Sequence, residues 1–228
     1  MPRTVCSWRG GKKREDTLGH PTDIIVRDLR PGDRDAAIEV LTDAFVDFPP
    51  VQIVVGTDRG AKDRLRRMNQ ATVTESTKSR LLVAERDGDI LGVLSYADPP
   101  DCFAMSWRQT LKVLRITGPR LFRMIGLYRE VMKFHPKTPH RHLSQVAVEP
   151  RAQRQGVGAA LMAAYCDACD EVGLPGYLET IAWADPTKPS QRKLYERYGF
   201  AVTHESPGGD GWSGLHMTRP ATDPSVST

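Results

Sequence analysis

Apolar and polar residues alternate, or recur three and four positions apart, in successive segments from residue 23 onward. The β-branched run at 23–29 ends at Pro31-Gly32 and predicts a first strand. Apolar residues at helical spacing predict a helix over 32–48, which Asp33 can cap. Two apolar runs on either side of Asp87-Gly88-Asp89 predict a β-hairpin.

The later segments alternate between strands and helices. The pattern predicts a charged helix within 61–80, strands at 142–148 and 176–183, a helix at 158–172, a short helix within 189–200 that ends at Gly199, and a strand pair around 200–206 and 214–219. This order predicts an α/β (α+β) domain of three layers, in which helices cover both faces of a mixed β-sheet.

Residues 104–142 differ from the rest in charge, with nine Lys/Arg and one Glu. Their apolar residues fall at helical spacing and predict two amphipathic helices broken at Gly118-Pro119. The aromatic side chains there occupy spacings expected of buried positions. This segment is either a basic face near an anionic ligand, a movable wall over a pocket, or an ordinary solvated helix face.

Composition favours one soluble domain over 23–220, since 39% of the 228 residues are hydrophobic and 26% are charged. No apolar run reaches the ~18–20 residues that span a bilayer, so no membrane partner is expected. The four cysteines form no dense framework, which indicates a reducing, cytoplasmic environment. Most of the net charge of +4 lies in 1–22, predicted to be a disordered basic extension, and 221–228 to be a polar tail. The charge therefore gives no support for a nucleic-acid partner.

The segment QRQGVG, Gln153–Gly158, lies between a predicted strand and a predicted helix. A helix N-terminus offers unpaired N–H groups and partial positive charge, and glycine lets a pyrophosphate approach the backbone. A Walker A loop is excluded because no Gly-Lys-Ser/Thr follows. A dinucleotide-binding turn is disfavoured because Leu161 stands where a small residue is required, and because Gly156 follows Val148 at too great a distance.

The spacing of this segment is that of an acyl-CoA loop, and here the chain resembles the GCN5-related N-acetyltransferase (GNAT) superfamily. A second motif of that superfamily, LYERYGF at 194–200, follows about forty residues later. The likeness is closest to the puromycin N-acetyltransferase branch, through DAFVDFPP, the LET strand and the terminal MTR. The chain departs from that branch in a longer link between Thr180 and Tyr195, and in Lys188 or Gln191 where an asparagine is usual.

The resemblance implies a centrally splayed sheet, acetyl-CoA as co-substrate without a metal, and transfer of an acetyl group to a small-molecule amine. It allows a homodimer. The strand before the loop would bind the pantetheine arm and the loop would bind the pyrophosphate. The implied cofactor-binding residues are Val146, Ala147, Val148, Gln153, Arg154, Gln155, Gly156, Val157, Gly158 and Ala159.

The resemblance also assigns catalytic residues. Tyr195 matches the general acid of the family, since a phenol can protonate a departing thiolate of similar basicity. His142 aligns with a base used in another branch, and imidazole suits proton removal near neutral pH. Glu179 is the alternative base, acting through water. Cys166 and Cys169 lack the second pair that a zinc site needs.

Other functions remain open at this point. One is a catalytically silent acyl-CoA-binding module, another a protein (lysine or N-terminal) acetyltransferase, and a third a nucleic-acid-associated protein that uses the basic segments. Charge and apolar residues near the predicted acceptor site favour a cationic, ring-bearing amine. Those residues are Asp33, Asp35, Glu39, Asp43, Asp47, Phe48, Phe103 and Trp107.

Overall fold

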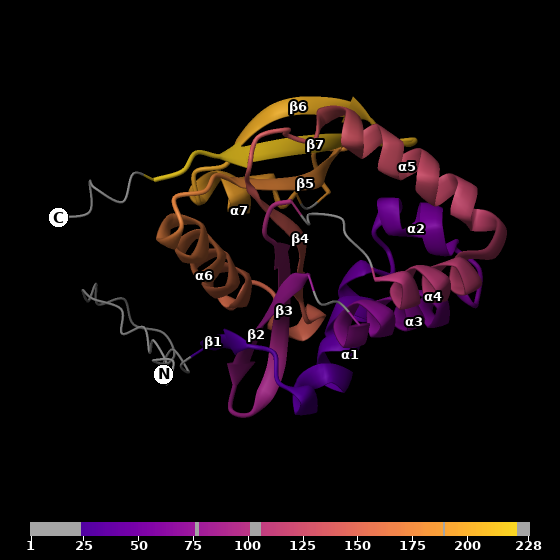
Figure 1. Cartoon of the computed structure of the whole chain (residues 1–228), viewed down its shortest axis with the longest axis horizontal. Coiled ribbons are helices and arrows are strands. Elements are labelled where there is room, and N and C mark those ends of the chain that lie inside the picture. Colours follow the sequence, from indigo (N-terminus) through magenta and orange to yellow (C-terminus); the bar gives the residue numbers. More distant parts are fainter. Residues whose placement is uncertain (1–23, 76–77, 101–105, 189, 223–228) are drawn as a thin grey trace.

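The computed structural model describes residues 24–75, 78–100, 106–188 and 190–222. The predictions for the extension 1–22 and for Phe103 lie outside the described residues, as does most of the predicted tail 221–228. Figure 1 shows the described chain as one open sheet with helices on both faces.

The sheet holds seven strands in the order β1-β2-β3-β4-β5-β7-β6. They are β1 (Ile25–Asp28), β2 (Ser79–Arg86), β3 (Asp89–Ala97), β4 (Arg141–Val148), β5 (Gly176–Trp183), β6 (Ala201–Pro207) and β7 (Trp212–Arg219). Strands β4 and β5 pair in parallel and the other neighbours pair antiparallel. The predicted mixed sheet and the hairpin of β2 and β3 are confirmed.

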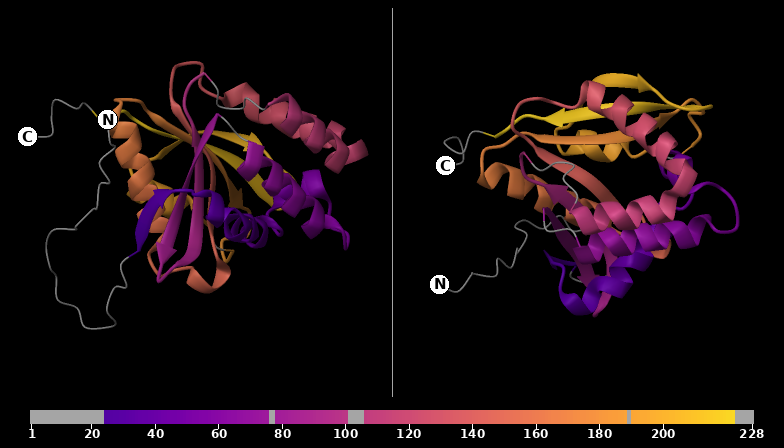
Figure 2. Two further views of the ribbon diagram at one scale, coloured as in Figure 1. Left: turned by 60° about the horizontal axis from the view of Figure 1, so that its bottom comes forward. Right: turned by 45° about the vertical axis from the view of Figure 1, so that its right-hand side comes forward.

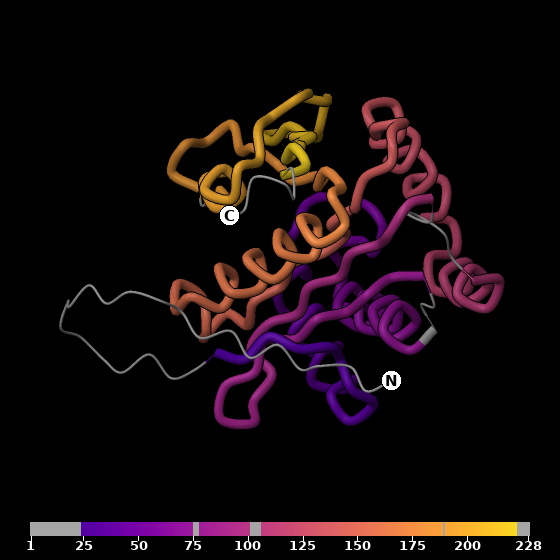
Figure 3. Tube along the Cα trace, turned by 60° about the vertical axis from the view of Figure 1, so that its left-hand side comes forward, coloured from indigo at the N-terminus to yellow at the C-terminus, as the bar shows by residue number. Residues whose placement is uncertain are grey.

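The helices are α1 (Arg34–Phe45), α2 (Pro49–Val55), α3 (Ala61–Glu75), α4 (Trp107–Thr117), α5 (Leu121–Phe134), α6 (Val157–Glu171) and α7 (Arg192–Arg197). Short 3-10 turns cover Pro31–Asp33, Gly118–Arg120 and Pro150–Ala152. Helix α6 lies across β1 to β4 on one face (Figure 3), and α1 covers β3 and β4 on the opposite face with α3 packed beside it (Figure 2). The predicted three layers are therefore confirmed.

Two local features differ from the sequence-based expectation. Helix α2 was not predicted, because the prolines that begin it read as a break; proline is tolerated at the first helical positions, where no N–H is needed. Asp33 stands at the N-terminus of α1 but does not cap it. Its carboxylate accepts hydrogen bonds from Arg27 Nη1 (2.6 Å) and from the Arg30 backbone N–H (2.7 Å) instead.

Helix α6 packs closely against β3 at Gly92. A Cβ at this position would lie 2.7 Å from Val157 Cγ1 and 2.9 Å from Leu161 Cδ1. We expect Gly92→Ala to lower the free energy of unfolding by about 1–3 kcal/mol, the usual effect of overpacking a core. Urea unfolding measures it, with Gly32→Ala as the control, since a Cβ at Gly32 would meet no atom within 4 Å. Equal losses in both variants would contradict this account of the packing.

Candidate active site

Strands β4 and β5 form a fork. Their paired positions run only from Arg141 to Leu143 on β4 and from Gly176 to Leu178 on β5. Beyond these positions the strands diverge, as Figure 1 shows. The central splay that the resemblance implied is therefore present. It leaves one edge of each strand without a strand partner inside the sheet.

The open edge of β4 presents backbone groups of two predicted residues. The Glu149 N–H donates to Leu91 O on β3 (2.9 Å), and backbone groups alternate in direction along a strand. The groups of Val146 and Val148 therefore point into the fork. Ala147 has its backbone turned toward β3 and its side chain buried beneath α1, so the structure does not favour the predicted cofactor contact of Ala147.

The open edge ends at the glycine loop. Gly156 has a φ of +89° and directly precedes α6, and a Cβ there would meet one atom within 4 Å, Ile24 Cδ1 at 3.8 Å. The Ala160 N–H donates to Gly156 O (2.9 Å), so the N–H groups of Val157, Gly158 and Ala159 precede the first hydrogen bond within the helix. The loop therefore offers backbone donors and the positive end of the helix dipole.

The other predicted loop residues have distinct surroundings. Gln155 anchors the loop, because its Oε1 accepts from Arg86 Nη2 (2.8 Å) and its Nε2 donates to Arg151 O (2.7 Å). Gln153 Nε2 approaches Val148 O at 3.5 Å. Arg154 has a φ of +61° in the turn. The Val157 side chain belongs to the core, and Ala159 O accepts from the Tyr198 hydroxyl (2.6 Å).

The two candidate bases, His142 and Glu179, are hydrogen-bonded to each other where β4 and β5 diverge. His142 Nε2 lies 2.7 Å from Glu179 Oε2, and His142 is buried. The second carboxylate oxygen of Glu179 lies 3.6 Å from His135 Nδ1. His142 is the second of the three paired residues of β4, and Glu179 is the first residue of β5 beyond the paired positions. The fork therefore begins at an imidazole–carboxylate pair.

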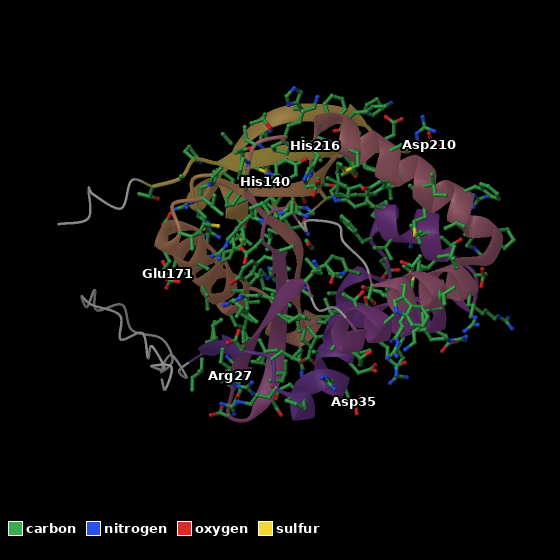
Figure 4. The ribbon with its side chains drawn as sticks, viewed as in Figure 1. Arg27, Asp35, His140, Glu171, Asp210 and His216 are labelled. Carbon is green, nitrogen blue, oxygen red and sulfur yellow. The ribbon has the colours of Figure 1, made fainter. Side chains whose placement is uncertain are left out.

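Histidine and tyrosine rings surround this pair. The ring of Tyr177 lies 4.9 Å from that of His135 and 5.3 Å from that of His140, and its hydroxyl lies 2.6 Å from His216 Nδ1. Figure 4 labels His140 and His216 on this side of the sheet. No role was expected for His135 or Tyr177 from the sequence. The sequence feature that could have indicated Tyr177 is its position two residues before Glu179, which places both side chains on one face of β5. Within the described residues, no group of three metal-ligating side chains is placed to hold a metal ion.

The environment of Glu179 keeps it ionised. Burial is the largest influence and opposes ionisation, but the charge and hydrogen bond of His142, together with His135, outweigh it. They lower the pKa of Glu179 to about 2. Burial is the main cause of the lowered pKa of both the His216 and the His140 imidazole. The pair at the fork is thus a permanent carboxylate beside an imidazole.

Tyr195 lies on α7 and belongs to the core cluster on the α6 side of the sheet. Burial raises the pKa of Tyr195 to about 12, so the phenol remains protonated at neutral pH. Within the described residues, no side chain or backbone group is hydrogen-bonded to its hydroxyl.

The predicted acidic surface for an acceptor is mostly neutralised. Asp33 pairs with Arg27, Glu39 with Arg66 and Asp43 with Lys62. Trp107 is exposed rather than part of a pocket wall. The structure therefore gives no support to an acceptor site formed by these residues, since each of the three acids already has a cation as its partner.

Of the predicted acids, Asp47 does line a cavity, which is open and about 530 Å³ in volume. Its other walls include Asp210, Trp183 and Trp212, and Lys188 Nζ lies 4.2 Å from the centre of the Trp183 ring. Figure 4 places Asp210 beside α5, near the end of the molecule where α2 lies. Trp183 follows Glu179 by four residues on the same face of β5, a separation of about 13 Å along the strand.

Solved structures share this fold. One is a histone acetyltransferase HPA2 and related acetyltransferase from Corynebacterium glutamicum, with 24% identity, a TM-score of 0.68, and coverage of 89% of this chain and 99% of that chain. Another is arylalkylamine N-acetyltransferase 2 from Aedes aegypti, with 15% identity, a TM-score of 0.60, and coverage of 88% and 100%. A third is the ribosomal-protein-S18-alanine N-acetyltransferase from Escherichia coli, with 17% identity, a TM-score of 0.53, and coverage of 90% and 99%.

The family comparison covers more than half of the chain. Residues 40–200 match the model of the acetyltransferase (GNAT) family. This range contains the fork, the glycine loop, the His142–Glu179 pair and Tyr195. The chain therefore belongs to the GNAT family of acetyltransferases.

Proposed function

We propose that this protein transfers the acetyl group of acetyl-CoA to a primary amine of a small molecule, by direct attack of the amine in a ternary complex. The observation that carries the proposal is the coincidence of three features at one fork. Open backbone groups of Val146 and Val148 lead from a loop of phosphate-binding geometry to the His142–Glu179 pair. These features fit a long ligand with a pyrophosphate at one end and a reactive acyl group at the other.

The residues present fit such a co-substrate. The N–H groups at the start of α6 and the guanidinium of Arg154 would hold the pyrophosphate, and the open edge of β4 would hold the pantetheine amides. A bound acetyl-CoA would supply an acetyl group activated as a thioester. A backbone N–H of β4 beside the fork would polarise the thioester carbonyl.

We assign His142 as the base and Glu179 as its positioning residue. A general base works best when its pKa lies near the working pH, and a carboxylate with a pKa of about 2 is too weak. The Glu179 carboxylate instead orients the imidazole through their 2.7 Å hydrogen bond. His142 would accept the proton that the amine loses on attack. Tyr195 would donate its hydroxyl proton to the departing thiolate.

Loss of CoA binding is expected on replacement of Gly156 by valine. The backbone φ of +89° disfavours a side chain, and a branched Cβ would occupy the space where a pyrophosphate must approach. Calorimetric titration of the folded protein with CoA measures the effect. Gly158→Ala is the control, because its Cβ would meet Val148 Cγ2 at an ordinary 3.5 Å. Unchanged affinity in folded Gly156→Val would refute the loop as the pyrophosphate site.

For the acceptor, we propose a cationic, ring-bearing amine that reaches the fork from the cavity beside Trp183. The two indole rings offer apolar walls, and Asp47 and Asp210 offer negative charge. This proposal agrees with the likeness to the puromycin N-acetyltransferase branch, which itself stays a prediction. It replaces the earlier set of acids with residues that line one cavity.

The acceptor proposal is tested by acetyl-CoA turnover, followed as free-thiol release, with a panel of amines. We expect arylalkylamines and aminonucleosides to exceed acidic amino acids and lysine peptides in kcat/KM. Asp210→Asn should raise KM for the best amine about five- to tenfold with kcat little changed, since loss of one partly exposed charge contact is worth about 1 kcal/mol. Asp35→Asn, on exposed α1 surface well away from Asp210 in Figure 4, is the control. If peptides are the best acceptors, the small-molecule assignment is refuted. If no amine is acetylated, a catalytically silent CoA-binding module is favoured.

A further inference from the structure

Helices α4 and α5 expose their large apolar side chains. Among the described residues, nine large hydrophobic side chains are exposed, and seven of them lie on these two helices. The most exposed are Trp107 at 69% and Phe122 at 79%. The complete set, called here the apolar stripe, is Trp107, Leu111, Leu114, Phe122, Ile125, Tyr128 and Met132. The expectation that the aromatic residues of this segment are buried is therefore wrong for Trp107 and Tyr128.

Helix α4 exposes several apolar side chains to solvent and buries polar ones. The helix buries Gln109, Val113 and Thr117, while Trp107 and Leu111 face solvent. In α5, no residue is fully buried, although Met124 and Leu127 pack beside α2. A soluble helix normally turns its apolar side to the core. An apolar surface of this extent marks a site of interaction.

Positive charge accompanies the apolar stripe. Between residues 107 and 134 there are seven Lys/Arg and one Glu, a net charge of +6. In α4, Arg108, Lys112 and Arg115 follow the stripe along one side at helical spacing. Figure 1 shows both helices at the end of the molecule away from α6. The surface thus combines exposed tryptophan, phenylalanine and leucine with a dense positive charge.

We propose that α4 and α5 dock this protein on an anionic lipid surface. An amphipathic helix at a bilayer interface buries large apolar and aromatic side chains and places Lys/Arg among anionic head groups. An anionic lipid surface would therefore bind both the apolar stripe and the Lys/Arg beside it. A second copy of the chain would bring together two surfaces on which Lys/Arg outnumber acidic residues, which charge repulsion opposes. A nucleic acid would meet the charge but leave the aliphatic side chains Leu111, Ile125 and Met132 in water.

This contact is peripheral. None of the helices in the described part of the chain is long and apolar enough to cross a membrane. The sequence-based expectation of no membrane partner depended on the lack of a spanning segment, which does not bear on a contact made at the surface. The stripe reaches the histidine cluster at one end, because Tyr128 and Met132 line a cavity with His135 and His140. Trp107 and Phe122 line neither this cavity nor the one beside Trp183, so docking and acetyl transfer can be tested separately.

The test uses the full-length protein and co-sedimentation with two kinds of vesicle, one of phosphatidylcholine alone and one of phosphatidylcholine and phosphatidylglycerol in equal parts. We expect binding to the anionic vesicles, weakened by high salt, and little binding to the neutral ones. The double variant Trp107→Ser/Phe122→Ser should lower the partition coefficient about tenfold or more. Val172→Ser is the matched control, because Val172 is an exposed apolar residue at the far end of α6.

Three outcomes overturn the proposal. One is a lack of binding to anionic vesicles by a folded protein. Another is binding that survives in the double variant, which would place the lipid contact elsewhere, for instance in the basic residues of 1–22. The third is a dimer in solution that the double variant converts to a monomer, because the stripe would then be a self-association surface. Selective loss of anionic-vesicle binding in the double variant, with Val172→Ser unchanged, supports it.

Discussion

Tyr195→Phe is expected to lower kcat by about 10²–10⁴-fold, the usual effect of removing a general acid. The phenol is buried, and burial raises its pKa to about 12, so the wild-type group carries its proton throughout the neutral range. The substitution keeps the ring that packs against Phe200 and deletes only the hydroxyl. Because that hydroxyl bonds no other described residue, the free energy of unfolding should change little.

The experiment compares steady-state kcat with CoA affinity measured by calorimetry. Affinity should be retained, since the loop and the open edge of β4 hold the co-substrate. Tyr165→Phe is the control: its hydroxyl donates to Arg141 O (2.7 Å) in the core, so this variant should lose about 1 kcal/mol of stability but retain kcat. Near-wild-type turnover of Tyr195→Phe would assign the acid role to another group or to water.

Much of the fold could be predicted because its signals are local. Hydrophobic spacing located the hairpin, the strand at 176–183 and the helix after the glycine loop, since each pattern spans a single element. The loop was recognisable for the same reason, as its chemistry depends on consecutive backbone positions. Helix α2 was missed because two prolines are read as a break, although the first turn of a helix tolerates them.

The rest depends on contacts between distant segments. His142 and Glu179 were each candidate bases, but only the parallel pairing of β4 and β5 brings them to a hydrogen bond. The acids of α1 were expected to attract an amine, and their ion pairs with Lys62 and Arg66 arise from the packing of α3. Likewise, helical spacing predicted amphipathic α4 and α5, but periodicity does not say whether the apolar side faces a core.

Replacement of His142 by glutamine should lower kcat/KM by about 10²–10⁴-fold, because a base is removed at the point where the strands part. Glu179→Gln keeps the shape of the side chain but removes the charge that orients the imidazole. If the two residues act as one unit, the double variant will be little worse than His142→Gln alone. Additive losses would instead mean that Glu179 acts separately, for example through water.

The pH dependence distinguishes the two roles. Glu179 has a pKa of about 2 and stays ionised in any practical assay, so the acidic limb of the kcat/KM profile must come from another group. If Glu179 were itself the base, wild-type kcat/KM would not decline until the pH approached 2. Such a profile would refute the assignment of Glu179 as a positioning residue.

The free energy of unfolding should also depend on pH, through the ionisation of Glu179 in the His142–Glu179 pair. Because the folded state depresses the pKa of Glu179, its stabilising contribution is fully present above the unfolded value of about 4.3 and declines as the pH falls toward 2. The difference in unfolding free energy between wild type and Glu179→Gln should therefore be constant near neutral pH and shrink below about pH 4. Denaturant unfolding at a series of pH values measures it. A difference that does not change between pH 7 and pH 3 would show that the carboxylate is not held ionised by His142 in the folded protein.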